Sequence, residues 1–168
     1  MKAVLGLIVG LFIAGAASAA DELATAQMQN RDGKALGKVT LTQTSQGVVL
    51  RVEMEGLPPG WHGIHIHGVG KCEPPFTTAG GHFNPGNQKH GFGKEGSHAG
   101  DLPNLYADAT GHANAEFLDA TVAIVEGGGA YLLGQDGTSI VVHAGLDDMM
   151  TDPAGNSGDR IACGVIKK

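Results

Sequence analysis

The chain has 168 residues, of which 42% are hydrophobic and 17% charged, with 28 glycines and a formal net charge of −6. This length fits one globular domain, and the acidic charge excludes a basic nucleic-acid binder. The apolar share is too high for a disordered chain, and so much Gly excludes a coiled coil or a helical bundle.

The first 20 residues have the pattern of a secretory signal peptide. Lys2 is their only charge, an apolar run extends from Val4 to Ala14, and small residues fill positions 16–20. A cation, an apolar stretch and a small-residue cleavage site in this order are typical of export signals, and the run is too short for a stable membrane span. We therefore expect residues 1–20 to be removed and residues 21–168 to form the mature domain.

Short stretches of alternating apolar and polar residues follow. In Val48–Glu55, Leu50, Val52 and Met54 share one face and charged residues share the other. Such period-two alternation predicts half-buried strands. We predict about eight strands: Leu23–Asn30, Leu36–Gln43, Val48–Glu55, Trp61–His67, His112–Asp119, Thr121–Glu126, Ser139–Ala144 and Arg160–Ile166.

Two stretches between these strands are predicted to be long loops. Gly68–Asn104 contains nine Gly and four Pro, and Gly145–Asp159 is the second. Loops of this length in a compact domain are usually functional. Many short strands with Gly-rich turns are typical of an antiparallel sandwich or barrel. The prediction is an all-β, eight-stranded antiparallel Greek-key barrel or sandwich with two long functional loops.

Six of the eight histidines lie between positions 62 and 98. His65 and His67 are two residues apart on a predicted strand, so their imidazoles point to the same side of the sheet. Two convergent imidazoles on a rigid strand form half of a metal site. His143 ends a later strand, from which it can return to meet them, although a histidine in this position, taken alone, is more often a surface residue at a strand end.

The long loop supplies further potential ligands, His82, His90, His98 and Asp101. Three His and one carboxylate make a ligand set suited to tetrahedral zinc. The alternative is a flexible, His-rich loop that binds metal weakly. The only two cysteines, Cys72 and Cys163, favour a single disulfide in an exported chain.

Taken together, these residues make the chain resemble the copper, zinc superoxide dismutases, most closely their bacterial periplasmic branch. The resemblance implies a Greek-key β fold, a periplasmic location, and dismutation of superoxide to dioxygen and hydrogen peroxide. The matching segments run in the family's order and cover most of the chain: Gly60–His67, Gly81–Pro85, His98–Asn104, Val142–His143 and Gly155–Ile166.

The resemblance also implies a ligand set for each metal. It assigns His82 to both ions, as a bridging imidazolate that takes up a proton when copper is reduced and delivers it to the forming peroxide. The implied copper ligands are His65, His67, His82 and His143. The implied zinc ligands are His82, His90, His98 and Asp101.

Other matching residues have implied roles around the metals. Asp147 matches a carboxylate that links ligands of the two ions, although a solvated loop Asp is the simpler reading. Arg160 matches the active-site arginine, and the two cysteines match the family's disulfide. His62 matches a structural His, whereas His112 matches nothing and is expected at the surface.

The net charge has the wrong sign for attracting an anion. Attraction of superoxide must therefore be local, from Arg160, from the metal charge and from the long-loop lysines Lys71, Lys89 and Lys94 as candidates. No nucleic-acid or membrane partner is expected, and the resemblance leaves both a monomer and a homodimer open.

Two other functions compete with catalysis of dismutation. One is a noncatalytic periplasmic copper- or zinc-binding protein on the same fold. The other is a zinc hydrolase, which is less favoured because no Glu positioned as a base follows the His65 and His67 pair.

Overall fold

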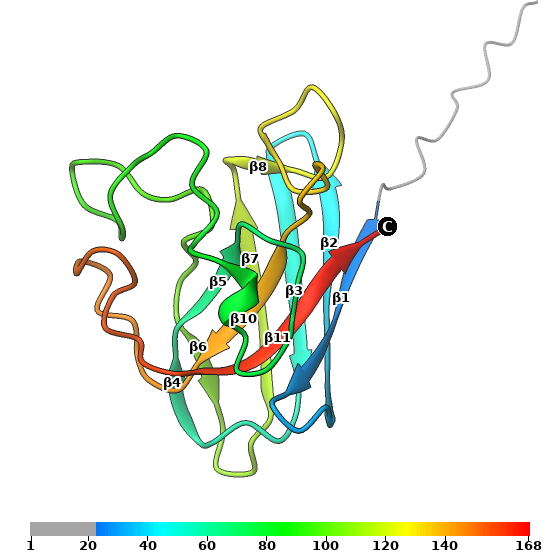
Figure 1. Ribbon diagram of the computed structural model, residues 1–168, viewed down its shortest axis with the longest axis vertical. Helices are drawn as coiled ribbons and strands as arrows, with labels where there is room; N and C mark the ends of the chain where they lie inside the picture. The colour runs from blue at the N-terminus through cyan, green and yellow to red at the C-terminus, as the bar shows by residue number, and fades with distance from the viewer. Residues whose placement is uncertain (1–22) are drawn as a thin grey trace, which may run out of the picture.

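The computed structural model describes residues 23–168, so the predicted signal peptide at residues 1–20 lies outside the described residues. The main element is a seven-stranded antiparallel sheet with the strand order β5-β10-β11-β1-β2-β3-β7. Figure 1 shows this sheet curled into a half-barrel, with the two long loops on one side. Its strands are β1 (Leu23–Asn30), β2 (Ala35–Thr44), β3 (Gly47–Met54), β5 (Ile64–His67), β7 (Ala113–Asp119), β10 (Ser139–His143) and β11 (Arg160–Lys167).

Two smaller strand pairs complete the fold. β4 (Gly60–His62) pairs antiparallel with β6 (Leu105–Ala107), and β8 (Val122–Ala123) pairs parallel with β9 (Ala130–Tyr131). The last strand, β11, lies beside the first, β1, which is the return expected of a Greek-key connection. Over residues 23–168, no helix is long and apolar enough to cross a membrane.

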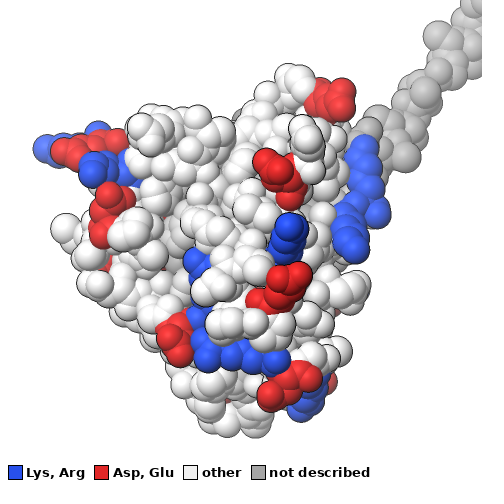
Figure 2. Space-filling view, viewed as in Figure 1, with Lys and Arg blue, Asp and Glu red and all other residues white. Residues whose placement is uncertain are grey.

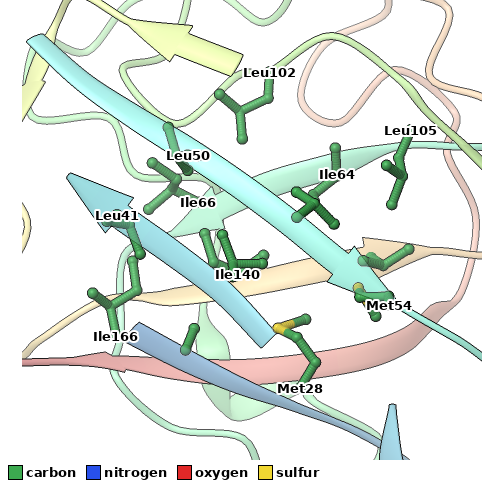
Figure 3. Packing of buried hydrophobic residues seen from close by; sticks show 14 of the residues in the cluster. Met28, Leu41, Leu50, Met54, Ile64, Ile66, Leu102, Leu105, Ile140 and Ile166 are labelled. Carbon is green, nitrogen blue, oxygen red and sulfur yellow. The ribbon is translucent and has the colours of Figure 1, made fainter. Parts of the chain in front are cut away.

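Alternation along the strands turns one face of the sheet toward a single core. In β3, Leu50 and Val52 are buried, whereas Arg51 and Glu53 on the other face are exposed. Figure 3 shows Leu50 pointing into the same interior as Ile66 and Ile140 from strands distant in the sequence. The predicted all-β class is therefore confirmed, and the core is built by the residues that the alternation predicts.

One predicted strand divides into two. The stretch Trp61–His67 forms β4 and β5, which pair with β6 and β10 respectively. Between them, the Gly63 N–H donates to Gly145 O and the Gly63 carbonyl accepts from the His143 N–H, both at 2.8 Å. A Cβ at Gly63 would lie 2.9 Å from the Cβ of Ser157, so a glycine is needed where the chain changes partner.

The described residues contain eleven strands, more than the sequence pattern predicts, because several are very short. β6 and β9 have three and two residues, too few to show alternation in the sequence. The stretch Thr121–Glu126 is reduced to the two residues of β8. Strands this short are defined by their partners rather than by their own pattern.

Both long loops are present, and the first is tied to the sheet. It contains one short 3₁₀ helix, η1 (Thr77–Ala79), and its Cys72 forms the predicted disulfide with Cys163 of β11. Phe76 and Val141 belong to a second buried cluster beside this disulfide. Val141 lies on the face of β10 opposite the main core, so the loop covers the outer side of the sheet here.

Replacing Cys72 and Cys163 with alanine is expected to lower the free energy of unfolding by about 4 kcal/mol. The disulfide spans 91 positions, and losing it increases the entropy of the unfolded chain. Urea unfolding of the variant and the parent measures the difference, with the reduced parent expected to resemble the variant. Equal unfolding free energies in all three samples would contradict this expectation.

Candidate metal centre

Four histidines converge at the side of the sheet covered by the loops. β5 pairs antiparallel with β10, with His65 opposite Val141 and His67 opposite Ser139, so His65 lies near the end of β10 that carries His143 and His67 lies near its start. His82 of the long loop joins them through an isolated β-bridge to His67. One ring nitrogen from each comes within 4.8 Å of the others, and we call these residues the first ligand group: His65, His67, His82 and His143.

Hydrogen bonds fix which ring nitrogen each of these histidines presents. The Nδ1 atoms of His67 and His143 each lie 3.0 Å from a carbonyl oxygen, of Gly80 and Gly158 respectively. A carbonyl only accepts, so each Nδ1 carries the proton and donates. The opposite nitrogens keep a free lone pair.

The remaining nitrogens of the first ligand group are buried and have no hydrogen-bond partner within residues 23–168. They are His65 Nδ1, His67 Nε2, His82 Nε2 and His143 Nε2. Buried polar atoms are nearly always paired, so four such atoms facing one another need a common partner. A metal ion would supply such a partner, and four imidazole nitrogens suit copper or zinc.

The second ligand group surrounds Asp101. Its Oδ1 lies 2.8 Å from His82 Nδ1, 3.0 Å from His90 Nδ1 and 3.2 Å from His98 Nδ1. Asp101 Oδ2 accepts from the backbone N–H groups of Gly91 and His98, which fixes the carboxylate. Three Nδ1 atoms and one carboxylate oxygen form the donor set of a tetrahedral zinc site.

His82 belongs to both groups through its two ring nitrogens. Its Nδ1 faces Asp101, whereas its Nε2 is among the unpartnered atoms of the first ligand group. One imidazole therefore lies between the two donor sets. Two cations on the same ring would favour loss of the single N–H proton that the neutral imidazole carries.

Asp147 links the two groups through the ring nitrogens that face away from the other ligands. Its Oδ2 lies 2.6 Å from His65 Nε2, and its Oδ1 lies 3.0 Å from His90 Nε2. These bonds hold the Nε2 protons and leave Nδ1 of each ring for a metal. Burial raises the pKa of Asp147, but the hydrogen bonds to His65 and His90 outweigh it and hold the pKa well below the usual range.

Burial keeps three of the ligand histidines, His67, His82 and His143, neutral in the metal-free protein by lowering the pKa of each ring. It lowers the pKa of His82 to about 4, against the opposing hydrogen bond to Asp101. It lowers the pKa of His143 to about 3 and that of His67 well below its ordinary value. Asp101 remains ionised, because hydrogen bonds from His82 and Gly91 overcome the effect of burial and lower its pKa to about 2. Neutral imidazoles and a carboxylate are the protonation states that metal ligation requires.

The metal-free protein is expected to lose stability as the pH falls from about 6.5 toward about 3. Below about 6.5 the unfolded chain binds protons at His82 and His143, whereas the folded chain does not until the pH nears their lowered pKa values. Urea unfolding across this range measures the loss, which should be smaller in His143→Gln. An unfolding free energy that is constant with pH in the metal-stripped protein would contradict the argument.

Arg160 lines a cavity of about 280 Å³ that also reaches His82, His98 and His143. Its guanidinium donates to the carbonyls of Phe76, at 2.7 Å, and Gly80, at 2.6 Å. Arg160 is thus held by the backbone of the disulfide-bonded loop, and no carboxylate of residues 23–168 forms an ion pair with it.

The candidate lysines do not line this cavity. Lys89 forms an ion pair with Asp152 at 3.2 Å, and together with Lys94 it borders a separate cavity. Among the described residues that line the cavity at His82, Arg160 is the only Lys or Arg. Figure 2 shows acidic and basic side chains interspersed on the viewed face, with uncharged surface between them.

The other two histidines lie outside both groups. His62 is buried, and its ring nitrogens lie 2.7 Å from the carbonyl oxygens of His143 and Pro58. His112 is exposed, and its Nδ1 lies 2.7 Å from the Thr110 hydroxyl. These positions agree with a structural role for His62 and a surface position for His112.

Several contributors to the centre were not singled out from the sequence. The carbonyls of Gly80 and Gly158 orient ligand rings through the backbone, which no residue type reveals. Asn104 is hydrogen-bonded to the backbone of Asp147, and its signal in the sequence is its place at the end of the matching segment His98–Asn104, three residues after Asp101.

The fold and these side chains define a class: an antiparallel β protein with two adjoining metal-ligand groups that share one imidazole. The model of the family described as copper/zinc superoxide dismutase (SODC) matches residues 35–166. The chain therefore belongs to the copper/zinc superoxide dismutase family.

Individual relatives are similar over most of their length. The chain is 43% identical over 171 residues to Cu-Zn superoxide dismutase 2 of Aquifex aeolicus, covering 99% of this chain and 100% of that one. It is 46% identical over 148 residues to the Cu-Zn superoxide dismutase of Caulobacter vibrioides, covering 86% and 85%. A SOD-like protein from Bacillus subtilis has a crystal structure with a TM-score of 0.80 at 39% identity, covering 84% of this chain and 96% of that one.

Proposed function

We propose that this chain catalyses the dismutation of two superoxide anions and two protons to one dioxygen and one hydrogen peroxide. The observation that carries the proposal is the pair of adjoining ligand groups with His82 in common, in a chain of this family. Four imidazoles suit copper, and three imidazoles with a carboxylate suit zinc. We therefore assign copper to the first ligand group and zinc to the second.

The metals supply chemistry that protein side chains lack. When bound, copper provides a one-electron redox couple, and zinc provides charge without a redox change of its own. Arg160 attracts the superoxide anion into the cavity and orients it beside the first ligand group. His82 borders the same cavity, and its Nε2 is the ring atom at which a proton can be held next to the substrate.

We also propose that the mature domain, residues 21–168, works in the periplasm. The support is the predicted signal peptide at residues 1–20, together with a disulfide, which is typical of oxidising compartments. The net charge of −6 argues against a nucleic-acid partner, and superoxide is the partner that the family implies. Either a monomer or a homodimer is compatible with this activity.

The alternative functions are not favoured. A noncatalytic metal-binding protein needs neither an unpaired arginine in a cavity at the ligands nor two complete ligand sets, and this chain has both. A zinc hydrolase needs a base beside the zinc-bound water. The two ligand groups of the described residues contain no Glu.

Metal titration of single-ligand variants tests the assignment. The parent is expected to bind one copper and one zinc per chain. His67→Ala should lose copper alone and His98→Ala zinc alone, whereas His82→Ala should weaken both, because only His82 belongs to both groups. His112→Ala is the matched control and should bind like the parent. Equal effects of His67→Ala and His98→Ala on both metals would contradict separate sites.

A further inference from the structure

Asn104 joins two segments that meet behind the metal centre. Its Nδ2 donates to the Asp147 carbonyl, and its Oδ1 accepts from the Asp147 N–H, both at 2.9 Å. One amide side chain, with its donor and its acceptor both in use, thus satisfies both backbone polar groups of a residue 43 positions away. Two bonds to one residue fix the place and the direction of its backbone.

The backbone of Asp147 decides where its carboxylate lies. Asp147 is only 2% exposed, and its two carboxylate oxygens contact His65 Nε2 and His90 Nε2. His65 belongs to the first ligand group and His90 to the second. A shift of the Asp147 backbone would therefore turn a ring in each group.

Gly155 confines the same carboxylate from another side. A Cβ at Gly155 would overlap Asp147 Oδ1 and Cγ, and it would lie 2.7 Å from His90 Nε2. The backbone of Gly155, with a φ of +60°, thus packs directly against the link between Asp147 and His90. Because this space is filled, the carboxylate cannot move there to compensate for a displaced backbone.

We propose that Asn104 is a positioning residue for the metal centre, acting through Asp147. Its side-chain hydrogen bonds in the described residues go to the Asp147 backbone and not to a ligand ring. Its effect is to hold Asp147 where one carboxylate orients His65 and His90 together. This inference rests on the proposed function only in that metals occupy the two ligand groups.

The test measures zinc affinity of the metal-free protein by chelator competition, without reference to superoxide. Asn104→Ala is expected to weaken zinc binding about tenfold. This is the lower end of the range of affinity losses that follow when a residue supporting the metal ligands is changed. In the Asp147→Ala background the same substitution should cause no further loss, because no carboxylate remains to be positioned. A role limited to loop stability would weaken binding equally in both backgrounds.

Further variants keep the test decisive. Asn104→Asp keeps the acceptor for the Asp147 N–H, but it replaces the Nδ2 donor with an oxygen that faces the Asp147 carbonyl and adds a negative charge. It should therefore bind zinc with an affinity different from that of the parent, and it serves if the alanine variant does not fold. Asn114→Ala, exposed on β7, is the matched control and should bind zinc like the parent. The Cu(II) electron paramagnetic resonance spectrum should also change in Asn104→Ala, since His65 belongs to the first ligand group.

Two results would overturn the proposal. One is parental zinc affinity in both Asn104 variants, and the other is an equal loss with and without Asp147. Either result leaves the proposed function standing, because the parent still binds its metals. If the parent itself binds no zinc, both the proposed function and this inference are wrong.

Discussion

Arg160→Glu is expected to lower the rate of superoxide dismutation by roughly tenfold to a hundredfold, the scale of local electrostatic attraction. Arg160 is the only Lys or Arg that lines the cavity at His82 among the described residues, and the chain carries a net charge of −6. Reversing this charge replaces attraction of the anion with repulsion. The dependence on salt should reverse as well, because screening weakens attraction in the parent and repulsion in the variant.

The matched control is Lys94→Glu, which makes the same change in net charge. Lys94 borders a different cavity, so its substitution should change the rate much less. Rates followed by superoxide decay at low and high ionic strength, with metal content measured on the same samples, separate attraction from metal loss. An unchanged rate in Arg160→Glu, or equal effects of the two substitutions, would refute the role assigned to Arg160.

Asp147→Asn is expected to weaken zinc binding roughly tenfold to a hundredfold, as substitutions of residues that hydrogen-bond to metal ligands commonly do. The carboxylate accepts from His65 Nε2 and His90 Nε2, whereas an amide offers only one accepting oxygen. One of the two rings then faces an N–H donor and must turn. We expect the copper spectrum to change too, because His65 is in the first ligand group.

Asp136→Asn provides the comparison for Asp147→Asn, since Asp136 lies exposed in a turn and undergoes the same chemical change. It should leave zinc affinity and the copper spectrum as in the parent. Chelator competition and electron paramagnetic resonance measure the two properties separately. Parental affinity and spectrum in Asp147→Asn would show that the ligand rings do not depend on this carboxylate.

Much of the fold could be predicted because the alternation of apolar and polar residues along a strand follows directly from the burial of one of its faces. The strand at Val48–Glu55 is nearly identical to β3, since a half-buried strand must alternate. The predicted strand at Trp61–His67 shows the limit of this reasoning. Its division at Gly63 depends on contacts with Gly145 and His143, which lie far away in the sequence.

The same distinction applies to the metal centre. The convergence of His65 and His67 follows from strand geometry alone, but their partners His82 and His143 required the family resemblance. Which nitrogen each ring presents could not be predicted. The Gly80 and Gly158 carbonyls decide it for His67 and His143, and any residue type supplies a carbonyl. That the candidate lysines do not line the cavity at His82 could not be predicted for a similar reason, because contacts with residues distant in the sequence determine the path of a loop.

The decisive measurement is the rate of superoxide decay in the presence of the metal-loaded chain and of the metal-free chain. We expect rapid decay with copper and zinc bound, with one dioxygen and one hydrogen peroxide formed for every two superoxide anions, and no acceleration by the chain with zinc alone. A chain with one copper and one zinc that removes superoxide no faster than buffer would contradict the proposed dismutase activity.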